Sequence, residues 1–135
     1  MVWISLYKLA PKCLNMRTEA DFLGEKQLPT QALYGIHSLR AKENFPDNTP
    51  FNKNWYKAIG VVKQACYFTV GEFKKAAMAK YPEKIKHLNL PGNPVLEKLI
   101  ASSIEVGKGD YFEHFIVPAI QGGAGTSINM NVNEI

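Results

Sequence analysis

The sequence predicts a mainly α-helical domain whose front is irregular and holds short extended segments. Two stretches, at about 54–79 and 93–108, carry apolar residues at the three- and four-residue steps of a helix that packs on one side. The stretch before them, 16–52, has no sustained helical period and is interrupted every few residues by glycine or proline. With 135 residues, 46% hydrophobic and 21% charged, the chain has the length and composition of one folded domain.

The first 15 residues differ in character from the rest. Met1 to Ala10 is apolar, but it is too short to span a membrane, and it lacks the basic stretch and clear cleavage site of a leader. A polar segment starts at Met16. We therefore expect residues 1–15 to be an upstream extension, translation to begin naturally at Met16, and residues 16–135 to form the domain. The alternative is that the first residues form a short edge strand.

The front of the domain, from Met16 to about Asn52, should consist of short extended pieces and turns, with a short helical turn around Ser38–Asn44. The first long helix is predicted from Asn54, as its cap, to about Ala79, with Pro82 just beyond its end. Its buried side should carry Trp55, Ala58, Ile59, Val62, Ala65, Cys66, Thr69, Val70, Phe73, Ala76 and Ala77, and the aromatic residues of 55–81 should be core.

Lysines and Glu72 fall mainly on the opposite side of this helix. Gly60 and Gly71 lower its helical propensity and could mark close contacts with another helix.

A second helix is predicted to start with Asn93 as its cap and Pro94 at its first position, and to end at Gly107. Its buried side should carry Val95, Leu96, Leu99, Ile100, Ser103 and Ile104. The segment Asp110–Ile120 is expected to be extended.

A glycine loop, Gly122-Gly-Ala-Gly125, precedes Thr126-Ser127 near the end of the chain. If Thr126 or Ser127 caps a helix through Asn129–Ile135, the loop and the helix end would offer backbone N–H groups and two hydroxyls to an anion. On these residues alone, a glycine turn into a capped helix is the simpler interpretation. A phosphate-binding P-loop would also need a lysine that is missing here.

The whole string Gln121-Gly-Gly-Ala-Gly-Thr-Ser-Ile-Asn-Met-Asn-Val-Asn-Glu-Ile135 closely resembles a signature of the aspartase/fumarase superfamily. The upstream segment Tyr34-Gly-Ile-His-Ser-Leu-Arg-Ala-Lys-Glu-Asn-Phe45 resembles the superfamily's Tyr-Gly-x-x-Thr-x-Arg-Ala-x-Glu-Asn-Phe, with serine in place of threonine. Glu19–Gly24 and Leu28-Pro29 also fit in order. The resemblance covers 16–135 and implies the N-terminal helical domain of that fold, cut before the central helical bundle.

Two details favour aspartase over class II fumarase. This chain reads Gly122-Gly-Ala-Gly-Thr126 where fumarases typically read Thr-Gly-Ser-Gly-Thr, and the pattern at His37 and Leu39 is similar to that of aspartases. Alanine in place of serine at position 124 removes a hydroxyl from the dicarboxylate site. The front domain of a class II fumarase remains the alternative.

The resemblance implies reversible deamination of L-aspartate to fumarate and ammonia. It assigns the contact with the substrate carboxylate to Thr126, with the backbone N–H groups of Gly125 and Ser127 as further candidates. Asn129 and Asn131 would hold the loop in shape behind them. No catalytic residue is assigned to this chain, because the serine base lies on a Gly-Ser-Ser loop that is absent here. We therefore expect the chain alone to be inactive, and the full-length enzyme to be a homotetramer.

Other classes of function have weaker support. A net charge of +4 with dispersed lysines is too diffuse to predict nucleic-acid binding. Two distant cysteines and the isolated histidines His37, His87 and His114 indicate no disulfide framework, metal site or cofactor, and favour a cytoplasmic protein without a membrane segment. A stand-alone anion- or phosphate-binding module is the alternative from another class.

Overall fold

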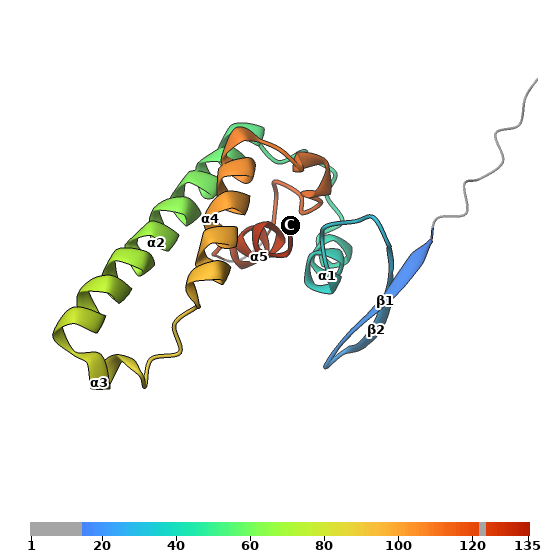
Figure 1. Ribbon diagram of the computed structural model, residues 1–135. Coiled ribbons are helices and arrows are strands. Elements are labelled where there is room, and N and C mark those ends of the chain that lie inside the picture. The colour runs from blue at the N-terminus through green and yellow to red at the C-terminus, as the bar shows by residue number, and fades with distance from the viewer. Residues whose placement is uncertain (1–14, 122–123) are drawn as a thin grey trace, which may run out of the picture.

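The computed structural model describes residues 15–121 and 124–135. Its elements are the strands β1 (Met16–Asp21) and β2 (Gly24–Pro29), the helices α1 (Ile36–Asn44), α2 (Lys53–Lys80), α3 (Pro82–Ile85), α4 (Asn93–Lys108) and α5 (Thr126–Glu134), and the 3-10 turn η1 (Phe112–His114). Figure 1 shows α2 and α4 side by side as a long antiparallel pair, with α5, α1 and the hairpin to one side of it. The predicted mainly helical fold with an irregular front is confirmed.

The front is an antiparallel hairpin followed by a short helix, as predicted in outline. β1 and β2 pair in register from Met16 with Pro29 to Asp21 with Gly24. The half-buried positions of β1 are Arg17, Glu19 and Asp21, so the face of this strand that turns to α1 is ionic instead of apolar. The predicted turn at Ser38–Asn44 is a helix that starts two residues earlier.

The bounds of α2 agree with the prediction to within one residue at each end, but its cap does not. The Asn52 carboxamide accepts a 2.8 Å hydrogen bond from the backbone N–H of Asn54, so Asn52 is the cap and Asn54 is inside the helix. The helix ends at Tyr81, and Pro82 starts the single turn α3.

The two glycines of α2 mark its contact with α4, as predicted. A Cβ atom on Gly60 would lie 2.4 Å from the backbone nitrogen of Gly107, and one on Gly71 would lie 3.2 Å from the Leu96 Cδ2 atom. The helices can approach this closely only because the Gly60 side of α2 has no side chain there.

The predicted buried side of α2 is wrong for most of its residues, since of the predicted set only Ile59, Val70 and Ala77 are half-buried. Trp55, Val62 and Phe73 are 61%, 62% and 50% exposed, whereas Tyr56, one position along, is fully buried. The side that packs against the rest of the protein carries Tyr56, Gly60, Lys63, Tyr67, Gly71 and Lys74. Apolar periodicity identified the helix correctly, but most of its apolar stripe lies on the outer face of the helix pair.

The start and end of α4 differ from the prediction. Its cap is Gly92, and Asn93 is the first helical residue; the Asn93 carboxamide accepts a 2.8 Å hydrogen bond from Lys74 Nζ. The helix passes through Gly107 and ends at Gly109, whose φ of +94° is the left-handed conformation that glycine adopts without strain. Leu96 and Ser103 are buried as expected, but Val95 is exposed.

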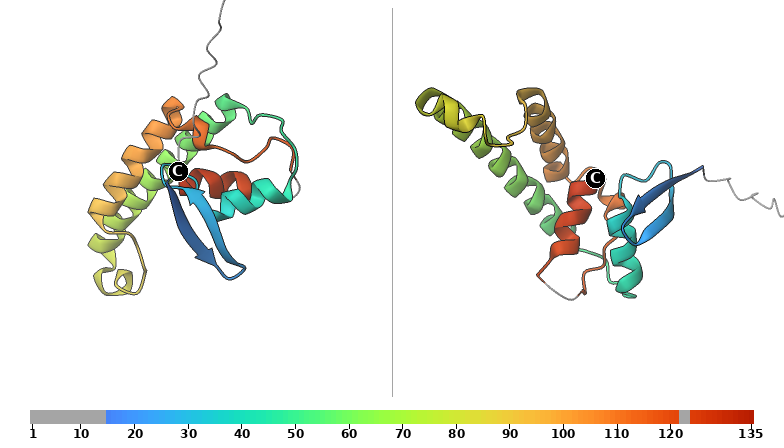
Figure 2. Two further views of the ribbon diagram at one scale, coloured as in Figure 1. Left: turned by 90° about the vertical axis from the view of Figure 1, so that its right-hand side faces the viewer. Right: turned by 90° about the horizontal axis from the view of Figure 1, so that it is seen from below.

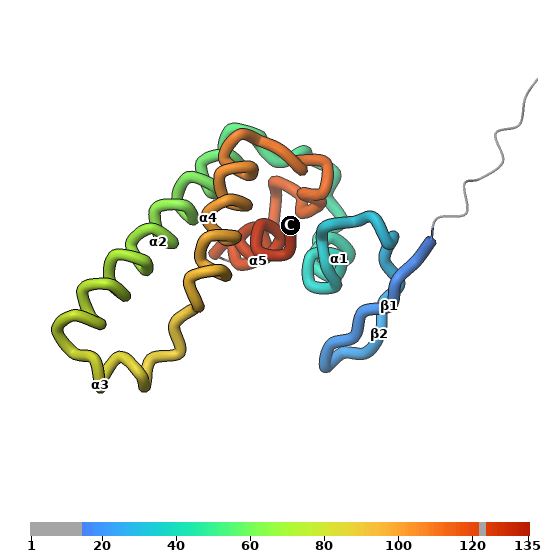
Figure 3. Tube along the Cα trace, in the orientation of Figure 1, coloured from blue at the N-terminus to red at the C-terminus, as the bar shows by residue number. Residues whose placement is uncertain are grey.

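The segment 110–120 is compact, not extended as predicted. Tyr111 has a φ of +60°, the 3-10 turn follows, and Figure 3 traces the path of the chain through this segment from the end of α4. This fold brings Phe115 and Val117 into the core with Ala41, Phe51, Tyr56, Val106 and Val132. Burial of these apolar side chains stabilises the compact path more than an extended strand without a partner would.

The buried phenol of Tyr56 joins the aromatic core to the end of α4. Its hydroxyl donates a 2.8 Å hydrogen bond to the Asp110 carbonyl, and burial, with the nearby carboxylates of Glu113 and Asp110, raises its pKa to about 12. Within residues 15–121 and 124–135, no helix is both long and apolar enough to cross a membrane.

Candidate functional site

The N-terminus of α5 carries the predicted contact residues. Gly125, at a φ of +80°, occupies the cap position, so the prediction that Thr126 or Ser127 caps the helix with its side chain is wrong. The predicted helix itself is present, from Thr126 to Glu134. Gly122 and Gly123, half of the predicted loop, lie outside the described residues.

The arrangement at this helix end suits a negatively charged group. Thr126 is exposed and Ser127 half-buried, and they form the first turn, where backbone N–H groups have no acceptor within the helix. The partial positive charge of the helix dipole adds to this preference for an anion. The structure thus brings Gly125, Thr126 and Ser127 together at one exposed helix end.

Asn131 fastens α5 to the segment that follows α4. Its side chain is fully buried, and its Oδ1 atom accepts hydrogen bonds from the backbone N–H groups of Ile116 (2.8 Å) and Val117 (3.3 Å). Its Nδ2 atom donates to the His114 carbonyl at 3.3 Å. A buried polar side chain with three partners fixes the orientation of the helix that carries it.

Asn129 lies on the opposite side of α5, where it meets α2. Lys63 Nζ donates to Asn129 Oδ1 at 2.8 Å and to Asn133 Oδ1 at 2.5 Å. The sequence pattern placed Lys63 on the solvent side of its helix, and Asn133 was given no role at the site. The four-residue spacing of Asn129 and Asn133, which puts both on one helical face, was the available signal.

The other end of α5 is bound to the start of α1. The Glu134 carboxylate accepts hydrogen bonds from the backbone N–H groups of Gly35 (2.9 Å), His37 (3.1 Å) and Ser38 (3.1 Å), and from the Ser38 hydroxyl. A Cβ atom on Gly35 would lie 2.8 Å from the Glu134 Oε1 atom, so a side chain at this position would have to displace the Glu134 carboxylate. Seen from below in Figure 2, α5 lies between α2 and α1.

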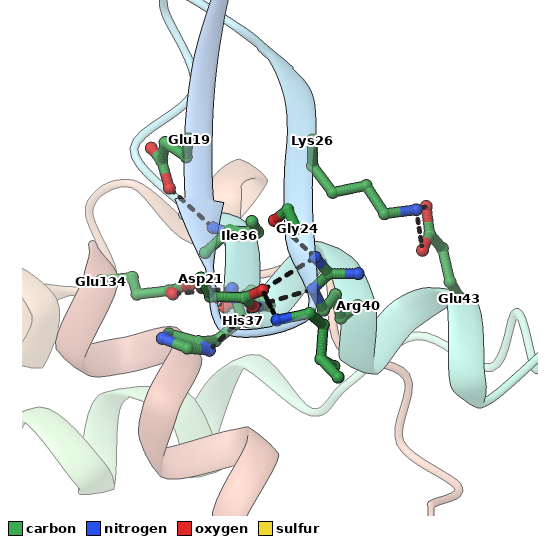
Figure 4. A network of polar contacts seen from close by, with 11 residues as sticks. Glu19, Asp21, Gly24, Lys26, Ile36, His37, Arg40, Glu43 and Glu134 are labelled. Atoms are coloured by element: carbon green, nitrogen blue, oxygen red, sulfur yellow. Dashed lines mark hydrogen bonds and ion pairs between the residues drawn. The ribbon is translucent and has the colours of Figure 1, made fainter.

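A second carboxylate reaches the same helix start from the hairpin, as Figure 4 shows. Glu19 accepts a 2.8 Å hydrogen bond from the Ile36 backbone N–H and pairs with Arg17 at 2.8 Å. Burial acts to raise the pKa of Glu19, but the hydrogen bonds from Arg17 and Ile36 outweigh it and leave the pKa below its ordinary value. Two of the chain's own carboxylates therefore occupy the N-terminus of α1.

Arg17 and Arg40 complete this polar layer. The Arg17 guanidinium also donates to the carbonyls of Pro29, Thr30, Ala32 and Tyr34, which shapes the loop between β2 and α1. Arg40 Nε donates to Asp21 Oδ2 at 2.8 Å, and this bond holds the pKa of Asp21 below its ordinary value against the opposing effect of burial. The network around the start of α1 consists of hydrogen bonds and ion pairs within the chain, which indicates a structural role.

The histidines have distinct surroundings. The His37 Nδ1 atom lies 4.0 Å from Asp21 Oδ2, and the His114 Nδ1 atom accepts a 3.3 Å hydrogen bond from the Leu33 backbone N–H. Among the described residues, no three His, Cys, Asp or Glu side chains gather in a group that could hold a metal ion.

A cavity of about 300 Å³ lies between α2 and the start of α4. Tyr67, Gly71, Met78, Asn93 and Leu96 are among its lining residues, and none of the predicted site residues lines it. The cavity and the N-terminus of α5 are therefore separate features.

Comparison with known proteins finds relatives by sequence, although not by family model. No protein-family model matches the chain. It is 39% identical over 122 residues to aspartate ammonia-lyase of a Bacillus species, 39% identical over 122 residues to that of Escherichia coli, and 38% identical over 122 residues to class II fumarate hydratase of Halobacterium salinarum. Each alignment covers 90% of this chain and 23% of the relative.

Comparison with solved structures gives a similar result. A crystal structure of "fumarate lyase:delta crystallin" from Brucella melitensis superposes with a TM-score of 0.70 and 34% sequence identity, over 89% of this chain and 25% of that one. The chain thus spans about a quarter of the length of the proteins it matches. By sequence and by fold, it is homologous to the N-terminal part of the aspartate ammonia-lyases and class II fumarate hydratases of the aspartase/fumarase superfamily.

Proposed function

We propose that this chain is the N-terminal part of an aspartate ammonia-lyase, which deaminates L-aspartate reversibly to fumarate and ammonia. The observation that carries the proposal is the exposed N-terminus of α5, where the Gly-Thr-Ser residues of the superfamily signature stand in the first turn of a helix. Two of the aspartate ammonia-lyases that it resembles are 39% identical to it.

The role of this chain is to hold one substrate carboxylate. Removal of a proton from Cβ places a second negative charge on the adjacent carboxylate before the amine leaves. Fixed donors around that carboxylate therefore stabilise the transition state more than the ground state. Thr126 supplies a hydroxyl and a backbone N–H, the backbone N–H groups of Gly125 and Ser127 add to it, and Asn129 and Asn131 hold the helix behind them.

The base that removes the proton is not assigned to any residue of this chain. The isolated chain should therefore give no fumarate from L-aspartate, as followed by ultraviolet absorbance. Measurable turnover by the isolated chain would contradict this division of roles.

A hybrid enzyme tests the proposal directly. Residues 16–135 would replace the homologous part of the Escherichia coli aspartate ammonia-lyase, to which they are 39% identical. We expect fumarate production from L-aspartate, and a loss of about a hundredfold on Thr126→Val, the size of effect seen when one transition-state donor is removed. A folded hybrid on which Thr126→Val has no effect would refute the role of Thr126.

A class II fumarase is the second candidate, because the Halobacterium salinarum fumarate hydratase is 38% identical over the same length. Alanine at position 124, which lacks the hydroxyl of the fumarase string, favours aspartase. Two hybrids, with an aspartate ammonia-lyase and a fumarate hydratase, assayed with L-aspartate and with malate, would separate the two. Turnover of malate alone would favour the fumarase.

A stand-alone phosphate-binding module would behave differently. A ligand that binds only the folded protein raises its melting temperature. Stabilisation by ATP but not by fumarate would favour that module, and the reverse pattern would favour the lyase.

The full-length enzyme is proposed to be a homotetramer. The exposed apolar side chains of α2, among them Trp55, Val62 and Phe73, support association, because exposed apolar patches often mark interaction surfaces.

A further inference from the structure

The helix that carries Thr126 and Ser127 is linked to α2 through one ammonium group. Lys63 lies in the middle of α2, and its Nζ atom bridges two carboxamide oxygens of α5, at 2.8 Å from Asn129 Oδ1 and 2.5 Å from Asn133 Oδ1. These acceptors are four residues apart and therefore lie on one face of α5, one turn above the other. The link spans 66 residues of sequence to Asn129 and 70 to Asn133.

The Lys63 end of the bridge is partly buried, whereas Asn129 and Asn133 are exposed. Lys63 is only half-exposed, and burial lowers its pKa. An ammonium that has lost part of its water needs acceptors from the protein, so the two carboxamides compensate it. A charged donor on one helix that reaches acceptors on another at short distance stabilises the contact more than a neutral hydrogen bond does.

The opposite side of α5 is held by Asn131, which is fully buried and bound to the backbone of residues 114–117. At 100° per residue, position 131 points away from both 129 and 133. Lys63 on one side and Asn131 on the other therefore prevent α5 from rotating about its own axis. This explains the alternation of the three asparagines along the helix.

We propose that Lys63 is a positioning residue that aims the N-terminal turn of α5 at the substrate carboxylate. Asn129 is three residues from Thr126, which is less than one helical turn, so a shift of Asn129 moves Thr126 with it. The inference rests on the proposed function, since it assigns Lys63 to the same carboxylate-binding turn.

The test uses three variants of the 135-residue chain. Lys63→Met keeps the apolar stem and removes the donor, and Lys63→Arg keeps a charged donor. Lys75→Met is the matched control, because Lys75 lies on the same helix, pairs with the exposed Glu72 and has a 75% exposed side chain. Asn133→Ala, which removes one of the two acceptors, replaces Lys63→Met if that variant does not fold.

The first readout is amide hydrogen exchange of the segment 124–135, measured by mass spectrometry at micromolar concentration. Lys63→Met should speed exchange in this segment about tenfold, as expected for the loss of a hydrogen bond to a charged group. Lys63→Arg should restore much of the protection, and Lys75→Met should leave it unchanged. Equal exchange in Lys63→Met and Lys75→Met would overturn the proposal.

The second readout is protection of the same segment by saturating fumarate. We expect fumarate to slow exchange in the wild type and in Lys75→Met, and to lose this effect in Lys63→Met. Full protection by fumarate in Lys63→Met would overturn the positioning role while leaving the proposed function intact. No protection in the wild type would instead count against the carboxylate-binding turn, and the positioning role would fall with it.

Discussion

The two halves of this molecule are stabilised in different ways. The hairpin, α1 and α5 are joined by charged hydrogen bonds, in which the carboxylates of Glu19 and Glu134 bind the start of α1. The α2–α4 pair is joined by close backbone contact at Gly60 and Gly107, and it exposes a row of large apolar side chains on its outer side. The carboxylates of the first half form hydrogen bonds within the chain. The outer side of the second half exposes apolar side chains to water. Substitutions in each half would test this contrast.

The largest effect should follow from Gly60→Val. A Cβ atom at this position would lie 2.4 Å from the Gly107 backbone nitrogen, and backbone cannot move aside as a flexible side chain can. We expect the free energy of unfolding to fall by about 3 kcal/mol, at the upper end of overpacking. Urea denaturation followed by circular dichroism would measure it.

Gly71→Ala is the matched control for Gly60→Val. Its Cβ atom would meet only the end of the Leu96 side chain, at 3.2 Å, and alanine gains about 1 kcal/mol of helical propensity over glycine. The change in stability should therefore be small. Equal effects at the two glycines would contradict close backbone packing as the basis of the α2–α4 contact.

Glu134→Gln should weaken the other half of the molecule by about 2 kcal/mol. The substitution keeps the shape of the side chain but replaces an acceptor-only carboxylate, which now binds three backbone N–H groups and the Ser38 hydroxyl. Hydrogen bonds to charged groups are worth more than neutral ones, and the helix dipole favours a negative charge here. The same urea titration measures it, with the exposed Glu72→Gln as the control.

Acid should loosen the hairpin before it affects the α2–α4 pair. The folded-state pKa values of Glu19 and Asp21 lie below their ordinary values of 4.5 and 3.8. Their contribution to stability is therefore fully present above about pH 4.5 and is lost as the pH falls through the lower folded-state values. Hydrogen exchange of residues 16–44 as a function of pH would follow this loss.

The variant Glu19→Gln is the control for the acid effect. It should differ from the wild type at pH 7 and approach it as the pH falls through the lowered folded-state pKa of Glu19, since neither protein then carries a charge at position 19. A constant difference across this range would mean that charge at Glu19 does not support the hairpin.

The smallest effect on stability should come from the outer face of α2. Val62→Ser and Phe73→Ser alter side chains that are 62% and 50% exposed, so the free energy of unfolding should change by less than about 0.5 kcal/mol. The same substitutions should reduce self-association, which we expect of the wild type because its apolar face is uncovered. Size-exclusion chromatography would measure this, and a wild type that elutes as a clean monomer would count against an association surface on α2.

The positions of the long helices were predictable, but their caps and faces were less so. Apolar steps of three and four residues located α2 to within one residue at each end. The cap moved from Asn54 to Asn52 because either asparagine satisfies the same sequence preference, and only the backbone conformation selects between them. Gly107 was taken for the end of α4 because glycine is common there, but it serves the contact with Gly60 instead.

The candidate site was predictable only in part. The signature string led to Gly125, Thr126, Ser127, Asn129 and Asn131, and their roles at the carboxylate remain predictions. Lys63 lies 66 residues before Asn129, and no local pattern connects the two. The hydrogen bonds of Asn131 could not be predicted from the sequence either, since its partners are backbone groups of residues 114–117.

The sequence by itself determined where the two long helices run, that Gly60 and Gly71 allow close contact, and which string resembles the superfamily signature, because all of these depend on neighbours along the chain. Only the tertiary structure decided which side of α2 is buried, that Gly125 and not Thr126 caps α5, and that Lys63 and Glu134 hold that helix in place. These outcomes depend on which surfaces meet in space, and an apolar stripe identifies a helix without showing which surface it packs against. In this molecule the apolar stripe of α2 faces outward, and the side of the helix that carries its glycines faces α4.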